Sequence, residues 1–228
     1  TLVEDQGEKL ILKEYDLKET PVELLKEESR IINELYKHHP RLFPKPISNK
    51  SGEYVLVSNS KAYKVFSYLE GHFFAEENHS NKMINSFGTA LAKMDLELLK
   101  LNSNTIQAQI LDWDIQHLNT FDFRSKYIKD PNKRKWSDYF ALQFKEQVLP
   151  NTSKLRKSLI HGDANDWNIL VSNEKINGII DFGDMCYAPL INELAIALTY
   201  IMFNKEDPID AACIMIKSYS EVLPLEKD

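Results

Sequence analysis

His161-Gly162-Asp163, followed by Asn168, and then Asp181-Phe182-Gly183-Asp184 are the two segments that decide the fold and the chemistry of this chain. Phosphoryl transfer from a nucleotide needs a carboxylate that receives the proton of the attacking hydroxyl, and oxygen ligands that hold Mg²⁺ on the phosphates. Asp163 can supply the carboxylate, and Asn168 and Asp181 can supply the ligands. At average residue usage, these fixed positions coincide by chance on the order of once in ten million chains of this size. The pattern therefore predicts a nucleotide-dependent phosphotransferase.

Two short β-prone runs connect these segments. Residues 169–172 and 176–181 are separated by the turn Ser172-Asn173-Glu174, which predicts a hairpin. We expect this hairpin to bring Asp181 beside the loop that carries Asp163 and Asn168. Because Mg²⁺ usually keeps several waters, two protein ligands are enough and no dedicated metal cage is needed.

Two further polar residues in these segments allow more than one interpretation. His161 is either a general base or a buried histidine that supports the loop, and the carboxylate two residues later favours structural support. Asp184 either binds metal or substrate, or caps the turn that follows it.

The front of the chain is predicted to form a small β-β-α-β-β unit. A turn at residues 5–8 precedes a strand at residues 9–15. Thr20, with proline next and Glu23 three residues later, has the pattern of a capping box at the start of a helix. Two more strands are expected, at residues 53–58 and 62–68.

The rest of the chain is mainly helical in pattern. Apolar residues recur at three- and four-residue steps from Met83 to Leu98 and again from Trp136 to Val148, and helices resume near Pro189 and Pro208. We place the boundary at Glu70-Gly71, which gives an N-terminal nucleotide-binding lobe at 1–70 and a C-terminal catalytic and substrate lobe at 71–228.

Composition excludes several classes of protein. With 43% hydrophobic and 27% charged residues, the 228-residue chain can bury a core and is not disordered, and two cysteines cannot form a disulfide framework. The net charge of −6 gives no general attraction to nucleic acid or an anionic membrane. The most apolar stretch, residues 194–203, is about half of the roughly 20 residues that cross a bilayer. We expect a cytoplasmic protein that binds neither nucleic acid nor membrane.

The two segments resemble a known superfamily. His161-Gly162-Asp163 with Asn168, and Ile180-Asp181-Phe182-Gly183-Asp184 followed by Glu193-Leu194-Ala195, are similar to the aminoglycoside, choline and homoserine kinase superfamily, with the hydroxylysine kinase-like branch most similar. Domains fused to class III aminotransferases share the likeness, so a fused domain in a longer protein is a further expectation. The resemblance implies an α+β, two-lobed protein-kinase-like fold: a small β-rich N-lobe, its first strand missing from this sequence, and a larger, mainly helical C-lobe.

The resemblance also implies a set of site residues. ATP and Mg²⁺ would be the cofactors, Asp163 the catalytic base, and Asn168 and Asp181 the magnesium ligands. Lys13 resembles the lysine that contacts the α- and β-phosphates, and Glu28 resembles its ion-pair partner, with Glu27 one residue away as the alternative. The nucleotide hinge is expected at Tyr68-Leu69-Glu70-Gly71, where the backbone of residues such as Tyr68 and Glu70 would bind adenine.

In this superfamily the hydroxyl acceptor usually carries an amine, so the expected partner is a small amino alcohol. Hydroxylysine is the first candidate, and ethanolamine, choline, homoserine or an aminoglycoside are alternatives. Carboxylates recognise ammonium groups, and the candidates are Asp166, Asp184 and Glu193. Asp112 and Asp114 are also candidates, but a helix-start cap suits this pair slightly better.

Two other classes of protein share parts of this pattern. A non-catalytic nucleotide-binding module of a multidomain protein is consistent with the missing first strand. The pattern Asp112-x-Asp114 resembles an aspartyl-phosphate phosphatase and His161 with Asp163 a metallohydrolase, but Gln116 and the scarcity of histidines disfavour both.

Overall fold

The computed structural model describes residues 1–120 and 122–226. Its first part is an antiparallel sheet in the order β1-β2-β5-β3, with β4 also paired to β5. The two strands that open the chain are joined by a tight turn in which Gln6 (φ 50°) and Gly7 (φ 84°) are both left-handed, as a two-residue hairpin turn requires. The strands are β1 (Leu2–Asp5), β2 (Glu8–Asp16), β3 (Pro46–Ile47), β4 (Leu56–Ser58) and β5 (Lys61–Ser67).

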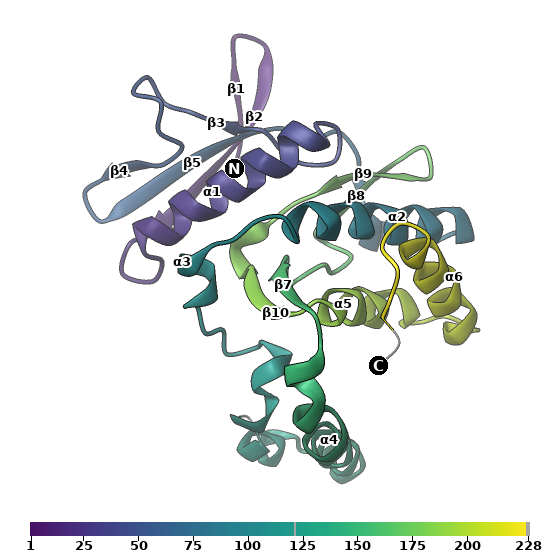
Figure 1. The fold of residues 1–228 in the computed structure, drawn as a ribbon. Coiled ribbons are helices and arrows are strands. Elements are labelled where there is room, and N and C mark those ends of the chain that lie inside the picture. Colours follow the sequence, from purple (N-terminus) through teal and green to yellow (C-terminus); the bar gives the residue numbers. More distant parts are fainter. Residues whose placement is uncertain (121, 227–228) are drawn as a thin grey trace.

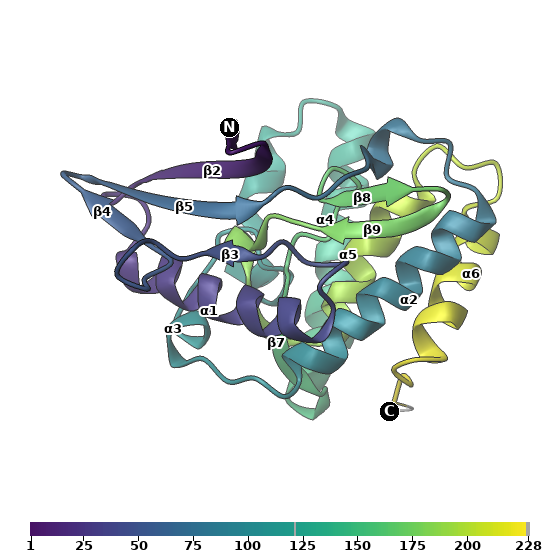
Figure 2. The same cartoon turned by 90° about the horizontal axis from the view of Figure 1, so that it is seen from above.

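Helix α1 (Val22–His38) lies along this sheet (Figures 1 and 2). Its buried face carries Leu25, Ile31, Ile32 and Leu35, at the spacing of an amphipathic helix. The predicted capping box is not formed, because the helix begins at Val22 and its N-cap residue is Pro21, which makes no side-chain cap hydrogen bond. The Thr20 backbone N–H instead bonds to the Asp16 carbonyl and closes the turn from β2.

A bundle of three helices forms the other side of the molecule. Helix α2 (Asn81–Leu98) packs along α6 (Pro208–Ser220), and α5 (Ile191–Met202) contacts both (Figure 2). The Ser80 hydroxyl caps α2 by accepting from the Met83 N–H at 3.3 Å. α6 begins with proline at its first turn, as expected from Pro208.

Gly88 allows α2 and α6 to approach closely. A Cβ at this position would lie 2.2 Å from Ser218 Oγ and 2.5 Å from the Met215 carbonyl oxygen, both on α6. We therefore expect Gly88→Ala to lower the free energy of unfolding by about 1–3 kcal/mol, the usual effect of overpacking a buried contact. Chemical denaturation measures the change, and Asn85→Ala, at an exposed position of the same helix, is the matched control. A Gly88→Ala protein as stable as this control would contradict the close approach.

Two small sheets lie between the helices and the first sheet. The strand pairing changes directly after Gly71, since β6 joins β8 and β9 in one sheet while β7 pairs with β10 in the other. The strands are β6 (His72–Phe73), β7 (Lys157–Ile160), β8 (Ile169–Ser172), β9 (Lys175–Ile179) and β10 (Cys186–Pro189). The predicted hairpin is therefore β8-β9, and its sheet packs on α2.

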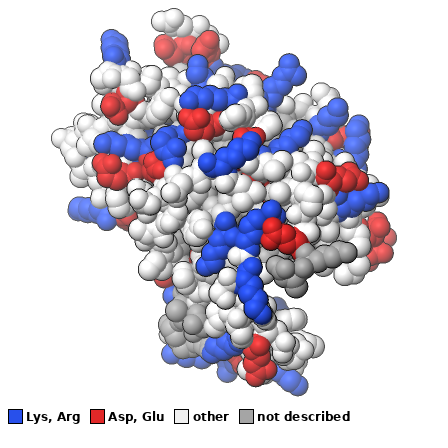
Figure 3. Space-filling model, viewed as in Figure 1, with Lys and Arg blue, Asp and Glu red and all other residues white. Residues whose placement is uncertain are grey.

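The remaining helices are α3 (Asn104–Gln107) and α4 (Pro131–Gln143). α4 projects away from the rest of the chain (Figure 1) and has no buried residue in the described structure. Within the described residues, no helix is both long and apolar enough to span a membrane. On the face seen in Figure 3, basic and acidic side chains are interspersed, in keeping with the small net charge of −6.

Candidate active site

The loop after β7 carries the predicted base. Gly162 has φ 81°, a left-handed conformation that side chains rarely adopt, and a Cβ here would lie 2.3 Å from the Asp184 carbonyl oxygen. Only glycine lets the loop pass this close to the backbone of Asp184. The backbone of the segment His161-Gly162-Asp163 therefore lies directly against that of the segment Asp181-Phe182-Gly183-Asp184.

His161 is buried and supports the loop. Its Nε2 lies 2.9 Å from the Ile180 carbonyl oxygen, and its Nδ1 accepts the Asp163 backbone N–H at 3.2 Å. These partners fit a neutral imidazole with the proton on Nε2. Burial lowers the pKa of His161, with opposing contributions from the bond to Ile180 and the nearby carboxylates. The histidine is thus held neutral between the two segments, where it orients the loop.

The Asp163 carboxylate is fixed by two amides. Oδ1 accepts from Asn165 Nδ2 at 2.8 Å, and Oδ2 accepts from Asn168 Nδ2 at 2.9 Å. Asn168 Nδ2 also donates to the Asp163 carbonyl at 2.8 Å. Because nitrogen makes these bonds, the amide oxygen is the end of Asn168 that can bind a cation.

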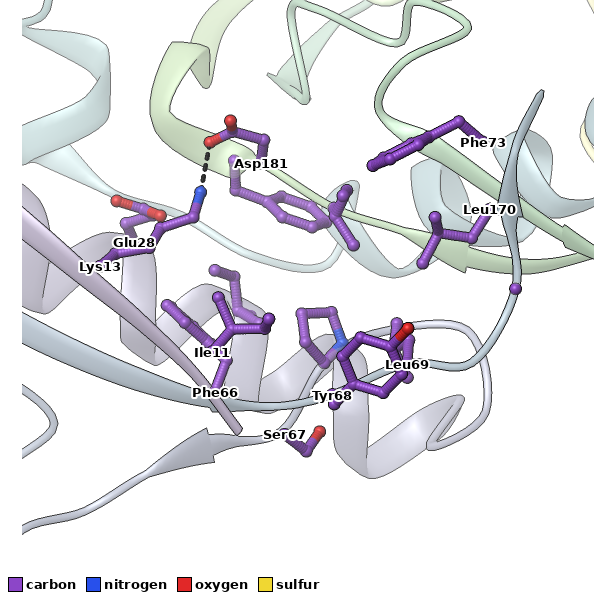
Figure 4. A pocket seen from close by; sticks show the side chains of 15 residues that line it. Ile11, Lys13, Glu28, Phe66, Ser67, Tyr68, Leu69, Phe73, Leu170 and Asp181 are labelled. Atoms are coloured by element: carbon purple, nitrogen blue, oxygen red, sulfur yellow. Dashed lines mark hydrogen bonds and ion pairs between the residues drawn. The ribbon is translucent and has the colours of Figure 1, made fainter. Parts of the chain in front are cut away.

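Asp181 follows β9 in a strained conformation, with φ 66° and ψ 69°. A left-handed backbone is uncommon for a residue other than glycine, although aspartate and asparagine tolerate it best. Asp181 Oδ1 accepts from Lys13 Nζ at 2.6 Å, and this ion pair joins β2 to the second segment (Figure 4). The side chains of Lys13 and Asp181 are 30% and 55% exposed, so a ligand can reach both.

Glu28 has a different partner from the one expected. Its Oε2 lies 2.7 Å from Lys64 Nζ, and the side chains of Lys64 and Glu28 are 1% and 4% exposed. The predicted pair of Glu28 with Lys13 is therefore wrong. The alternative, Glu27, is also excluded as the partner of Lys13, because it forms a bidentate pair with Arg30 one turn along α1.

An apolar cavity of about 230 Å³ lies beside the Lys13–Asp181 pair (Figure 4). Tyr68 lines it, as the hinge prediction requires, but Glu70 does not, because its side chain is exposed near Lys9 and its carbonyl accepts from Asn177 Nδ2 at 2.6 Å. The Glu70 side chain is thus turned away from the cavity, and a contact of adenine with its backbone N–H stays a prediction. The remaining walls come from both parts of the chain and are mostly apolar: Ile11, Ile32, Pro44, Phe66, Leu69, Phe73, Leu170, Ile180 and Phe182.

A second cavity, of about 510 Å³, is lined by Asp163, the predicted base. Three carboxylates line it, those of Asp114, Asp163 and Asp184, together with the aromatic rings of Trp113 and Tyr200. Burial raises the pKa of Asp184, and the charges of Asp163 and Asp181 raise it further. Among the described residues that form this wall there is no lysine or arginine.

The loop residues Asp112 and Asp114 have separate roles. Asp114 Oδ1 accepts the Gln116 backbone N–H at 3.0 Å, which is the capping role expected from the sequence, and the residue also lines the second cavity. Asp112 is exposed and pairs with Arg124 at 3.2 Å outside that cavity.

Glu193 lies behind the loop and not in either cavity. It is fully buried, and its Oε2 accepts the backbone N–H groups of His161 and, at 3.3 Å, of Gly162. Burial raises the pKa of Glu193 to about 7. The prediction of a substrate contact at Glu193 is corrected, since this residue anchors the base segment to α5. Asp166 also lies outside both cavity walls, and its carbonyl accepts the Ala75 N–H at 3.0 Å.

The oxygen atoms available at this site suit a magnesium ion that arrives with the phosphates of a nucleotide better than a metal held by protein ligands alone. No group of three or more His, Cys, Asp or Glu side chains arranged for a metal occurs in the described part of the chain. Asn168 and Asp181 supply hard oxygen atoms, and Mg²⁺ usually takes few protein ligands and keeps waters and substrate oxygens. The metallohydrolase alternative has no metal cluster here to support it. Lys64 was not predicted from the sequence. Its only sequence signal is that it falls on the buried side of β5, where buried and partly exposed residues alternate.

Comparisons with known proteins concern the family and the fold. A sequence model described as "Phosphotransferase enzyme family" matches residues 1–214. Hydroxylysine kinase of Xenopus laevis is 28% identical over 209 residues, which cover 81% of this chain and 56% of that protein. The chain therefore spans little more than half the length of this relative.

Two solved structures share the fold. The amicoumacin kinase hAmiN, in complex with AMP-PNP, Ca²⁺ and Ami, has a TM-score of 0.73 at 17% identity, covering 100% of this chain and 73% of that one. A microcompartment-associated aminopropanol kinase has a TM-score of 0.71 at 15% identity, covering 99% and 73%. The predicted α+β, protein-kinase-like fold is confirmed.

Proposed function

The chain belongs to the phosphotransferase enzyme family, and we propose that it transfers the γ-phosphoryl group of ATP to a hydroxyl of a small molecule that carries an amine. One observation carries the proposal: Asp163 lines the acidic cavity, Lys13 and Asp181 line the apolar cavity, and Asn168 is hydrogen-bonded to Asp163. We infer that the two reactants occupy separate cavities beside the segment 181–184, which lends Asp181 to one wall and Asp184 to the other.

The apolar cavity suits the nucleotide. Adenine would lie against its apolar walls near Tyr68, and Lys13, at the polar end, would bind phosphate oxygens. Asn168 and Asp181 would hold Mg²⁺, which neutralises the charge that develops on the phosphates. AMP-PNP in the amicoumacin kinase structure supports this placement by analogy of fold.

The acidic cavity suits the acceptor. Its hydroxyl oxygen would attack the γ-phosphorus, its proton would pass to the Asp163 carboxylate, and ADP would leave with the oxygen of the broken bond. The amides of Asn165 and Asn168 hold that carboxylate in place before the acceptor arrives. Asp114 and Asp184 would bind the ammonium group of the acceptor by charge-assisted hydrogen bonds.

Hydroxylysine is the first candidate acceptor, supported by the name of the Xenopus laevis relative. A second candidate, an amino alcohol without a carboxylate such as ethanolamine or aminopropanol, is favoured by the cavity wall. Among the described residues, this wall includes three carboxylates and no lysine or arginine. The carboxylate of an amino acid would therefore have no cation to neutralise it there.

An acceptor panel tests the proposal. The full-length protein is incubated with ATP, Mg²⁺ and hydroxylysine, homoserine, ethanolamine, aminopropanol, choline or an aminoglycoside, and ADP release is measured. We expect at least one amine to stimulate release above the level of Asp163→Asn. If none does, the kinase proposal fails and a non-catalytic nucleotide-binding module is favoured. Faster release with the amino acids than with the amino alcohols would reject the second candidate.

Asp114→Asn tests recognition of the amine. It retains an oxygen for the Gln116 backbone N–H, removes the charge and loses the bond that Oδ2 accepts from Gln116 Nε2. We expect the KM of the stimulating acceptor to rise about 10- to 100-fold, the value of a charged hydrogen bond. The KM of ATP should stay unchanged. Asp112→Asn, on the same loop but outside the cavity, is the matched control. Equal effects of the two variants would contradict an ammonium site at Asp114.

A further inference from the structure

Two carboxylates lie buried in the helical part of the chain, one on α2 and one on α5. Asp95 and Glu193 are both 0% exposed. Asp95 Oδ2 accepts the Tyr219 hydroxyl at 2.6 Å, and Glu193 Oε2 accepts two backbone N–H groups of the loop that carries Asp163. Burial raises the pKa of Asp95 well above its usual range, and the charge of Glu193 raises it further. The two carboxylates are therefore close enough to interact.

Each carboxylate has one oxygen atom left over. Asp95 Oδ1 and Glu193 Oε1 are buried and have no hydrogen-bond partner among the described residues. A buried oxygen without a partner is costly, and two ionised carboxylates beside each other in a buried site repel strongly. Two such oxygens can bond to each other only when one of them carries a proton. A single proton between them would satisfy both oxygens and leave one negative charge in place of two.

Two groups face Asp95 from neighbouring elements, and neither removes the need for a proton. Tyr219 of α6 remains a neutral donor, because burial raises the pKa of its hydroxyl and the charge of Asp95 raises it further. The charge of Arg156, which precedes β7, acts against burial and lowers the pKa of Asp95. The Arg156 guanidinium, however, pairs with Glu226 at 3.3 Å, where both side chains are partly exposed.

The loop determines which carboxylate keeps the negative charge. Glu193 Oε2 accepts the N–H groups of His161 and Gly162, and such bonds favour the ionised form. Burial raises the pKa of Glu193 and these N–H groups lower it, whereas the charge of Asp163 raises it again. The His161 ring is neutral and brings no charge to the pair. Asp95, with one hydroxyl bond, is thus the better place for the proton.

We propose that Asp95 and Glu193 share one proton, carried on Asp95, and that Asp95 is in this way a positioning residue for the loop of Asp163. The Glu193 carboxylate then accepts hydrogen bonds on both oxygens, from Asp95 on one and from the loop on the other. Its orientation, and with it the position of the loop, is fixed from both sides. The effect on catalysis rests on the proposed function, whereas the shared proton does not.

Infrared spectroscopy tests the proton directly. A protonated carboxyl group has a C=O stretching band that carboxylates lack, and exposed carboxyl groups are ionised at pH 7. We expect this band in the spectrum of the original protein in deuterium oxide at pH 7 after subtraction of the Asp95→Asn spectrum. Subtraction of Glu193→Gln should leave it too, because in either variant an amide N–H replaces the shared proton. Asp138→Asn, which removes an exposed carboxylate of α4, is the control and should leave no band.

The pH dependence of unfolding gives a second test. The unfolded chain releases its carboxyl protons above about pH 4, whereas the folded pair keeps one. Unfolding therefore releases a proton, and a rise in pH favours it. We expect the unfolding equilibrium constant of the original protein, divided by that of Asp95→Asn, to rise by up to about tenfold per pH unit between about pH 5 and 7. Chemical denaturation at each pH measures this ratio.

Two substitutions of Asp95 test the positioning role. Leucine has a similar volume but no donor for Glu193, so we expect Asp95→Leu to lower kcat by up to about 100-fold, since a small displacement of a catalytic group can cost that much. The KM of ATP should stay unchanged. Asp95→Asn should recover most of kcat, because its amide N–H can donate to Glu193. If Asp95 only filled space, this recovery would not occur.

The shared proton is rejected if the difference spectra contain no protonated carboxyl band, or if the ratio of unfolding constants does not change with pH. Equal kcat values for folded Asp95→Leu and Asp95→Asn would reject the positioning role. If Asp95→Asn does not fold, Glu193→Gln takes its place in the spectra and in the denaturation series. Absence of ADP release with every acceptor would count against the proposed function, and the first two measurements would still decide on the proton.

Discussion

Asp163→Asn is expected to lower kcat by about 10²- to 10⁴-fold, the range for loss of a general base. The amide cannot take the proton of the acceptor hydroxyl. Its nitrogen would also face one of the two amide groups that now donate to the carboxylate, from Asn165 and Asn168. ADP release at saturating ATP, Mg²⁺ and acceptor measures the effect.

The control for this variant is Asp138→Asn, which changes an exposed carboxylate on α4. Thermal unfolding of both variants separates a loss of chemistry from a loss of folded protein. An Asp163→Asn enzyme whose kcat stays within tenfold of the original would remove Asp163 from the role of base.

Asp181→Asn is expected to abolish productive dependence on Mg²⁺. Loss of outer-shell partners alone commonly costs 10–100-fold in metal affinity, so loss of a charged ligand should reduce kcat/KM for ATP by at least about 100-fold. Asparagine is the informative replacement because it tolerates the left-handed backbone of residue 181, whereas alanine would add strain.

A titration of activity with total Mg²⁺ measures this prediction: the original protein should saturate, and the variant should show no saturable activation over the same range of concentration. The unfolding midpoint without Mg²⁺ should change little, because the pair with Lys13 is partly exposed and such pairs contribute about 0–1 kcal/mol. An unchanged magnesium midpoint with unchanged activity would contradict a ligand role for Asp181.

The catalytic segments were the part of the site that the sequence predicted best. The predicted hairpin β8-β9 is formed, and the Ile180 N–H donates to the Asn168 carbonyl at 3.0 Å, which brings the segment that ends at Asp181 beside the loop of Asp163. The roles of Asp163, Asn168 and Asp181 in catalysis and metal binding stay predictions. The helices near 83–98, 191 and 208 also follow from periodicity and proline positions, which are local signals.

The errors concern partners that are distant in sequence. The pairing of Glu28 with Lys64 joins α1 to β5, and the carbonyl of Glu70 accepts from Asn177, 107 residues away. Glu193 has a carboxylate that could bind an ammonium group. The packing of α5 against the loop instead directs this carboxylate to backbone N–H groups of the loop. No local pattern specifies such contacts.

The missing cap at α1 has a different physical cause. Thr20 and Glu23 have the spacing of a capping box, but the turn from β2 uses the Thr20 backbone for a bond to Asp16. The helix therefore begins at Val22. Losing such a cap costs about 1 kcal/mol, which is small compared with the free energy gained by burying the apolar face of α1.

The close approach at Gly162 has a consequence for motion between the lobes. Since the backbone of Gly162 lies against that of Asp184, and His161 contacts the Ile180 carbonyl oxygen, we expect Asp163 and Asp181 to move together. Lys13 belongs to the other sheet. A movement of the first sheet relative to this loop would therefore change the distance from Lys13 to Asp181 and leave the distance from Asp163 to Asp181 constant. The Lys13–Asp181 distance is then the one that reports such a movement.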